Sequence, residues 1–318
     1  MLGKTHYKLG IGYYLIFLPI IITVFTVNKA DQVILGIICA AVAALLPDID
    51  SSTSKINIKN PITGIPVKFI DITTKIFLYI IRCGILMGVS YLLWRHAINA
   101  EKHKQLLQSI SICLLVLGLI GNKIIRFIPF YSHFETIAIM LCEKIKKTVI
   151  IILITAIVIA GFIYNFNTYN DWVIYLFGVV LIFSTVFPHR TFTHSIEGFL
   201  SYSFYAYYLS TLFRYQHLGA AFIIGYFSHI YLADIFTDSG IPLSFIPYLL
   251  RRIGVHGKMK EKESKIYNAI YKILSIRLRI NLMTTGSGWE AFYYSVVLIL
   301  AAYVLKQSFD SIRTLITF

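Results

Sequence analysis

Apolar segments long enough to cross a bilayer follow one another along nearly the whole of this 318-residue chain. A spanning helix needs roughly 20 consecutive apolar residues. Hydrophobic residues make up 57% of the sequence and charged residues 14%, and the mean hydropathy is +0.73. Because backbone N–H and C=O groups in lipid must be satisfied within the protein, such segments fold as helices. The sequence therefore predicts an all-α, polytopic integral membrane helical bundle with a single integral domain over residues 1–318.

About nine of these segments are predicted to cross the membrane. They are residues 9–27, 33–46, 69–94, 106–121, 148–164, 172–187, 196–213, 218–233 and 289–305. A further segment, 124–142, is apolar but contains Arg126, His133 and Glu135, so we expect it to be interfacial or re-entrant. The connection 95–104 is basic, although the predicted topology places it outside the cytoplasm. The number of crossings near 69–142 could therefore differ by one hairpin.

The net charge of +14 comes from short basic runs between apolar segments, a pattern that orients membrane proteins with the basic side in the cytoplasm. No soluble basic module is visible, so a nucleic-acid partner is not expected. Residues 251–279 are basic and then carry isoleucine and leucine at helical spacing. This pattern favours an amphipathic helix on the inner leaflet, with a solvated connecting loop as the alternative. The segment could also recruit an acidic partner.

Seven metal-ligand candidates all fall near the predicted cytoplasmic face. Carboxylates and imidazoles in membrane segments are costly and usually have a functional role. The seven are His6, Asp48, Asp50, His189, His194, His229 and Asp234. Nearly all of them lie at one face, whereas a transport pathway needs polar groups through the membrane. The sequence therefore predicts a shared divalent-metal site, with zinc favoured by the imidazoles and manganese possible if carboxylates dominate.

Two of the ligand-bearing segments begin at a proline that ends a predicted helix. In PDID, Asp48 and Asp50 follow Pro47, and the alternative is a polar stop at the membrane boundary. In HRTFTHS, His189 and His194 would lie about 140° apart on a continuous helix, so a turn is needed to bring them together. Thr191 or Thr193 could cap the next helix. Arg190 could hold a phosphate bidentately, whereas a merely basic loop is the competing interpretation.

The segment GYFSHIYLADIFTDSG, at 225–240, places His229 within an apolar helix and Asp234 near its end. A π-bulge or a helix end between them would let both reach one site. Ser228 could orient an imidazole, although a lone intramembrane histidine is more often a packing residue. In TTGSGWE, Glu290 could cap the last helix or serve the site, and Thr285, Gly286 and Ser287 could bind an anion. A flexible entry turn is an equal alternative.

The order of these motifs resembles the YdjM-like family of predicted membrane-bound metal-dependent hydrolases. The matching stretches are THYKLG, PDID, HRTFTHS, GYFSHIYLAD with TDSG, and TGSGWE. They span most of the chain, but about 55–180 carries no motif and is expected to be inserted or divergent helices. The family is thought to be distantly similar to zinc-dependent phospholipases C, in which His and Asp residues hold zinc and cleave phosphodiesters. This resemblance implies a phospholipase C-like phosphodiesterase.

We therefore expect a metal-dependent hydrolase in the cell membrane, with its site facing the cytoplasm and a metal-activated water as nucleophile. Its expected substrate is a phosphoester, such as a membrane lipid or a lipid-linked phosphate. Asp50 would be a ligand or the general base, Arg190 would neutralise a phosphate, and Glu290 would serve the site. The alternative is a non-catalytic cation-binding membrane scaffold or transporter, because intramembrane ionisable groups also mark ion pathways.

Overall fold

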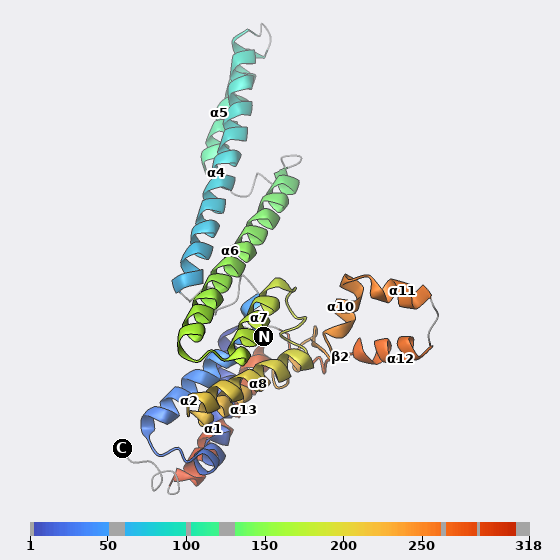
Figure 1. Cartoon of the computed structure of the whole chain (residues 1–318). Helices are drawn as coiled ribbons and strands as arrows, with labels where there is room; N and C mark the ends of the chain where they lie inside the picture. Colours follow the sequence, from blue (N-terminus) through green and yellow to red (C-terminus); the bar gives the residue numbers. More distant parts are fainter. Residues whose placement is uncertain are drawn as a thin grey trace. The chain divides into compact units, whose positions relative to one another are not determined.

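The computed structural model describes residues 3–50, 61–99, 103–120, 131–261, 265–284 and 287–309. The described residues are mostly helical, as the apolar segments predict, and they include one pair of two-residue strands (Figure 1). It divides into two compact units. The first comprises Met1–Asn60 with Ile151–Phe318, and the second comprises Pro61–Ile150. All candidate ligands belong to the first unit. The expectation of a single domain with a divergent region at 55–180 stays a prediction.

Helix α9 is the centre of the first unit. It packs against α1, α2 and α8, and α1 also packs against α13. The approach of α9 to α2 is close, since a Cβ at Gly225 would overlap the carbonyl oxygen of Ala40. The ranges of these helices are α1 (Gly3–Phe25), α2 (Ala30–Ala43), α8 (Ile196–Leu212), α9 (Gln216–Ile230) and α13 (Gly288–Gln307).

Short elements connect the helices of the first unit. The ends of α2 and α9 each lead into a 3-10 turn, and α7 precedes the loop that reaches α8. Strand β1 pairs antiparallel with β2, with Ile241 opposite Leu278. These elements are η1 (Leu46–Asp50), α7 (Trp172–Val186), η3 (Asp234–Phe236), β1 (Ile241–Pro242) and β2 (Arg277–Leu278).

The second unit contains α4 (Pro61–Ile98), α5 (Lys104–Ile120) and the first part of α6 (Tyr131–Thr168). Helices α4 and α5 pack side by side, and Ser90 and Ser111 exchange buried hydrogen bonds between them. Lys146 of α6 pairs with Asp71 of α4 and with Glu143.

Helix α6 corrects one expectation. Residues 131–142 are not a separate interfacial segment but the start of one 38-residue helix; residues 124–130 lie outside the described part of the chain. His133 and Glu135, which suggested a separate segment, do not interrupt the backbone, and the stretch 131–160 contains neither Gly nor Pro.

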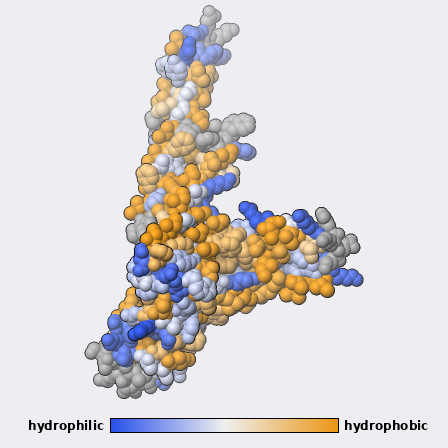
Figure 2. Space-filling view, in the orientation of Figure 1, coloured by the Kyte–Doolittle hydropathy of each residue, from blue (hydrophilic) through white to orange (hydrophobic). Residues whose placement is uncertain are grey.

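Five of the described helical segments are long and apolar enough to cross a membrane. They are Thr5–Phe25, Gly64–Ile98, Glu135–Thr168, Gln216–Phe236 and Gly288–Gln307. Shorter apolar helices occur at Ala30–Ala43, Lys104–Val116 and Trp172–Val186. Apolar residues cover much of the visible surface, as expected for helices that face lipid (Figure 2). An all-α membrane protein is therefore supported, whereas the number of nine crossings stays a prediction.

The basic segment 251–279 contains the end of α10 (Ile246–Arg252), α11 (Val255–Glu261) and α12 (Lys265–Leu274). The predicted amphipathic helix corresponds to α12, and its position on the inner leaflet stays a prediction. The three helices fold back on one another, and the ring of His256 stacks on Tyr271. Gly254, with φ of +74°, lies between the first two helices and lets the chain turn there. Helix α12 is amphipathic, has no buried residue, and exposes Ile266, Ile270 and Ile273.

Candidate metal centre

Helix ends bring the candidate ligands of the first unit together. His6 lies in the first turn of α1, and His229 lies in the last turn of α9. Asp234 follows in η3, and Asp48 lies in η1 after α2 ends. Because α9 stops at Ile230, the chain can turn and return Asp234 towards His229, which a continuous helix would not allow. Helix termination, rather than a π-bulge, therefore makes the pair converge.

The loop between α7 and α8 supplies the remaining histidines. Its turn brings the rings of His189 and His194 to a centroid separation of 5.0 Å. Arg190 adopts a left-handed conformation with φ of +60°, a strained arrangement for a residue with a side chain and one that is common at functional sites. Ser195, rather than Thr191 or Thr193, caps α8 by accepting from the Gly198 N–H.

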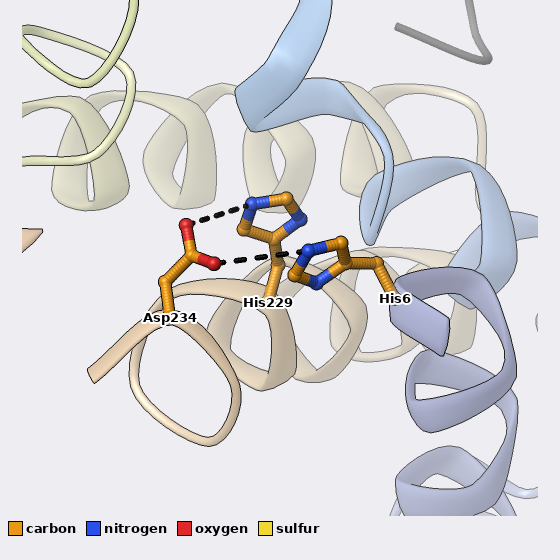
Figure 3. Close-up of side chains that lie close together, drawn as sticks. All are labelled: His6, His229 and Asp234. Atoms are coloured by element: carbon orange, nitrogen blue, oxygen red, sulfur yellow. Dashed lines mark ion pairs between the residues drawn. The ribbon is translucent and has the colours of Figure 1, made fainter. Parts of the chain in front are cut away.

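Asp234 is the most buried acid of the cluster, with 1% exposure, and both of its oxygens face cations or imidazoles (Figure 3). Its Oδ2 lies 3.3 Å from His194 Nε2 and 3.4 Å from His229 Nε2. Its Oδ1 lies 3.7 Å from His6 Nε2 and 3.8 Å from Arg190 Nη2. The rings of His6 and His229 stack with centroids 3.8 Å apart.

Asp48, the second carboxylate of the cluster, faces three imidazoles that come from later segments of the chain. Its Oδ1 lies 3.6 Å from His194 Nε2 and 3.7 Å from the Nε2 atoms of both His189 and His229. Two groups of converging ligand atoms result, and they share His229. One group is His6, His229 and Asp234, and the other is Asp48, His194 and His229.

The outer nitrogens of two rings are fixed by neighbouring groups. His229 Nδ1 lies 2.6 Å from the carbonyl oxygen of Ala44. A carbonyl only accepts, so Nδ1 carries the proton, and the Nε2 of a neutral ring then presents its lone pair to the cluster. His194 Nδ1 is held at 3.0 Å by the hydroxyl of Thr193, whose own carbonyl accepts from Tyr226. Such outer partners typically orient metal-binding histidines.

The inner atoms of the cluster fit a metal ion. Among the described residues, His194 Nε2, His229 Nε2 and both oxygens of Asp234 are buried without any hydrogen-bond partner. Buried polar atoms in native proteins nearly always have partners, so a group of such atoms needs an explanation. Ligands about 2.0–2.1 Å from a tetrahedral zinc lie about 3.4 Å apart, close to the separations around Asp234 Oδ2.

Without a metal, a proton on His194 balances part of the negative charge. Burial disfavours the imidazolium, but the charges of Asp234 and Asp48 outweigh it and raise the pKa of His194 to about 9. Burial acts in the opposite direction on Asp48, yet His229 and His194 hold the pKa of its carboxyl well below the usual value. The cluster therefore keeps its carboxylates ionised, the state in which they bind cations.

The chain matches the family described as YdjM inner membrane protein over residues 1–310. It belongs to this family. No curated protein and no solved structure matches it. The family resemblance seen in the motifs is thus confirmed, and it extends through the region 55–180, which carries no motif. The more distant similarity to zinc-dependent phospholipases C stays a prediction.

Among the predicted site residues that the structure describes, Glu290 and His189 belong to neither ligand group. The side chain of Asp50 lies outside the described residues, as do Thr285 and Gly286. Glu290 is buried in the first turn of α13, but neither ligand group includes it. His189 contacts Asp48 with a side chain that is 39% exposed, so it lies at the edge of the cluster.

The orienting groups differ from those expected. The hydroxyl of Ser228 donates to the Gly225 carbonyl of its own helix, so it does not hold an imidazole. The Ala44 carbonyl and the Thr193 hydroxyl take that role instead. Sequence reasoning missed Ala44 because a backbone carbonyl at the end of any helix has the same chemistry. Thr193 was noted only as a possible cap, although its position beside His194 was a signal for a second role.

Proposed function

We propose that this membrane protein is a metal-dependent hydrolase that acts on a phosphoester, with a membrane lipid or lipid-linked phosphate as the preferred class. The carrying observation is the group of buried imidazole nitrogens and carboxylate oxygens that converge without hydrogen-bond partners. Carboxylate and imidazole ligands suit zinc, or manganese where carboxylates dominate. The subclass, a phospholipase C-like phosphodiesterase, follows only from the family resemblance.

The ligand set of this proposal is His6, Asp48, His194, His229 and Asp234. A bound zinc ion would act as a Lewis acid and bring the pKa of a coordinated water towards about 7. Ala44 and Thr193 hold two of the imidazoles in a fixed orientation, which keeps their Nε2 atoms directed inward. Asp48 and Asp234 supply the negative charge that attracts the cation.

Arg190 is suited to bind the substrate's phosphate. Its side chain is 24% exposed and lies 3.8 Å from Asp234, so a guanidinium stands at the accessible edge of the cluster. Arginine binds phosphate oxygens with paired, parallel hydrogen bonds. In this proposal Arg190 orients the phosphoester and offsets its charge, and Asp50 is a ligand or the general base. The positive-inside pattern of the sequence supports a cytoplasmic position for the proposed site.

The arrangement at helix ends favours an enzyme over a transporter. His6, His229 and Asp48 all lie at or just beyond helix termini of the first unit. A transport pathway requires polar groups at successive depths through the bilayer. A cation-binding scaffold remains the competing function, and it differs from the hydrolase in having metal without turnover.

The test uses the full chain, purified in detergent, as wild type, Asp234→Asn and Asp238→Asn. Asp238 is an exposed carboxylate four residues away, so it controls for charge loss in the same turn. We expect about one or two metal ions per chain in wild type and Asp238→Asn. In Asp234→Asn, metal content should fall and hydrolysis of bis(para-nitrophenyl) phosphate should drop by more than about 100-fold.

Two outcomes would contradict the proposal. Absence of metal after reconstitution with zinc and manganese would remove the metal centre itself. Metal that is bound by wild type and lost in Asp234→Asn, with no hydrolysis of a panel of phosphodiesters and lipid phosphates, would support a cation-binding scaffold or transporter instead.

A further inference from the structure

An apolar cavity of about 440 Å³ lies next to the metal centre, between η3, the segment after β2 and the start of α13. Its size is within the range of about 300–1,000 Å³ that ligand pockets commonly have. Its lining is almost wholly apolar and aromatic and includes Phe236, Met283, Trp289, Phe292, Tyr293 and Val296.

Two residues that line the cavity are connected to the segment that carries the metal ligand Asp234. Phe236 belongs to the same 3-10 turn as Asp234, and its ring packs edge-on against Tyr293 at 5.6 Å. The hydroxyl of Tyr293 donates to the carbonyl of Leu232, two residues before Asp234. A ligand in the cavity would therefore contact the same 3-10 turn that carries Asp234.

Cationic side chains lie near β2, in the segment that continues to the cavity. Residues after Asp234 run beside 276–283, with Ile280 donating to Ile235 and Leu282 donating to Phe236. Near β2, the guanidinium of Arg277 donates to the carbonyls of Ser239 and Gly240. Arg279 lies at the same turn, because a Cβ at Gly240 would meet the Cβ of Arg279. Arg190 lies nearby, with its Nη2 3.8 Å from Oδ1 of Asp234.

The rim of the cavity is open to the surroundings of a membrane helix. Trp289 and Phe292 on α13 are 67% and 60% exposed, and Leu282 is 60% exposed. Gly288–Gln307 is one of the segments long and apolar enough to span a membrane, and exposed apolar side chains on such a helix are expected to face lipid. Tryptophan near the end of such a helix is typical of the bilayer interface. A hydrocarbon chain could enter sideways from the bilayer.

We propose that this cavity is the binding site for the hydrocarbon chain of an anionic lipid, whose charged group lies towards Arg277, Arg279 and Arg190. The inference deepens the proposed function, since it names the part of the substrate that the apolar side of the site holds. An apolar cavity beside a cationic strip matches a molecule that carries hydrocarbon and negative charge on adjacent parts. Neutral bilayer lipid would match only the cavity.

Photochemical cross-linking tests the site without requiring turnover. The full chain, in lipid nanodiscs, would be exposed to phosphatidic acid with a diazirine near the end of one acyl chain, and separately to diacylglycerol with the same chain. We expect adducts on Met283 and Phe236, with phosphatidic acid labelling them about fivefold more than diacylglycerol, the ratio that roughly one surface charge contact provides. Met283 is 6% exposed, so its labelling requires a chain inside the cavity.

Two variants and a matched control sharpen the result. Val296→Trp fills the cavity and should reduce labelling of Met283 to background. Ile299→Trp adds the same ring on α13 at an exposed position outside the cavity and should leave Met283 labelling unchanged. Arg279→Gln should reduce the preference for phosphatidic acid to less than about twofold. Adducts confined to exposed positions such as Ile299, or equal labelling by both probes, would overturn the proposal.

Hydrolysis separates this inference from the proposed function. If both hold, Val296→Trp lowers turnover of the phosphatidic acid probe, whereas Ile299→Trp leaves turnover of that probe and of bis(para-nitrophenyl) phosphate unchanged. If wild type hydrolyses neither compound yet Met283 is labelled selectively, the catalytic proposal fails and the lipid site stands. If hydrolysis occurs in wild type and labelling of Met283 is absent, the lipid site fails alone.

Discussion

Helix α9 carries a buried histidine at each end, and the two ends differ in what surrounds the ring. His217 at the start is 4% exposed, and His229 at the finish is fully buried. Among the described residues, His229 belongs to both groups of converging ligand atoms, whereas His217 belongs to neither. The comparison shows that burial of an imidazole does not by itself make a metal site. Two carboxylates delivered by turns after α2 and α9 make the difference.

The largest expected difference between the two ends is in metal binding. His229→Ala should weaken zinc affinity by more than about 100-fold, since removal of an outer partner alone typically costs 10–100-fold. His217→Ala should change it by less than about twofold, because His217 belongs to neither group of converging ligand atoms in the described part of the chain. Metal content by mass spectrometry and competition with a zinc chelator would measure both. Equal losses would mean that the variants act through folding rather than ligation.

A smaller effect is expected from the group that orients a ligand. Thr193→Val keeps the shape of the side chain but removes the hydroxyl that holds His194 Nδ1. Zinc affinity should fall by about 10–100-fold. Thr191→Val is the control, because the hydroxyl of Thr191 contacts the Pro188 carbonyl instead. If Thr193→Val binds zinc as tightly as wild type, the orientation of His194 does not depend on this contact.

The middle of α9 should tolerate change less well than a lipid-facing helix. A methyl group at Gly225 would overlap the Ala40 carbonyl, so Gly225→Ala should destabilise the protein by about 1–3 kcal/mol. Gly161→Ala on α6 meets nothing within 4 Å and should be neutral or stabilising by up to about 1 kcal/mol. Thermal unfolding in detergent, read by a thiol-reactive dye, would compare the two. A neutral Gly225→Ala would indicate that α2 and α9 separate more easily than their close approach implies.

The smallest effect concerns the turn after α9. The hydroxyl of Tyr293 bonds to Tyr13 and to the Leu232 carbonyl, so Tyr293→Phe should lower stability by about 1 kcal/mol. Tyr303→Phe, on the same helix but 59% exposed, should change stability by less than about 0.5 kcal/mol. The same unfolding assay measures both. Indistinguishable melting temperatures would show that water or lipid replaces the Tyr293 contact at no cost.

Most of the site could be predicted from residue type and from position at the ends of apolar segments. His6, Asp48, His194, His229 and Asp234 were selected because polar ligands at the ends of apolar segments are costly, and the structure brings these five together. The sequence could not rank His189 and Glu290 below them, since exposure and distance depend on contacts between distant segments. It also could not anticipate Arg277, whose position beside Ser239 and Gly240 follows from the pairing of β1 with β2.

The sequence by itself determined the helical membrane fold and the family, because apolar length and motif order are local properties of the chain. The continuity of α6 was not predicted, because the charged groups of the segment 124–142, among them His133 and Glu135, suggested a separate interfacial segment. Only the tertiary structure decided which atoms face one another: the Ala44 carbonyl sets the tautomer of His229 across 185 residues of sequence. Such directional contacts depend on the packing of helices, and no spacing along the chain encodes that packing.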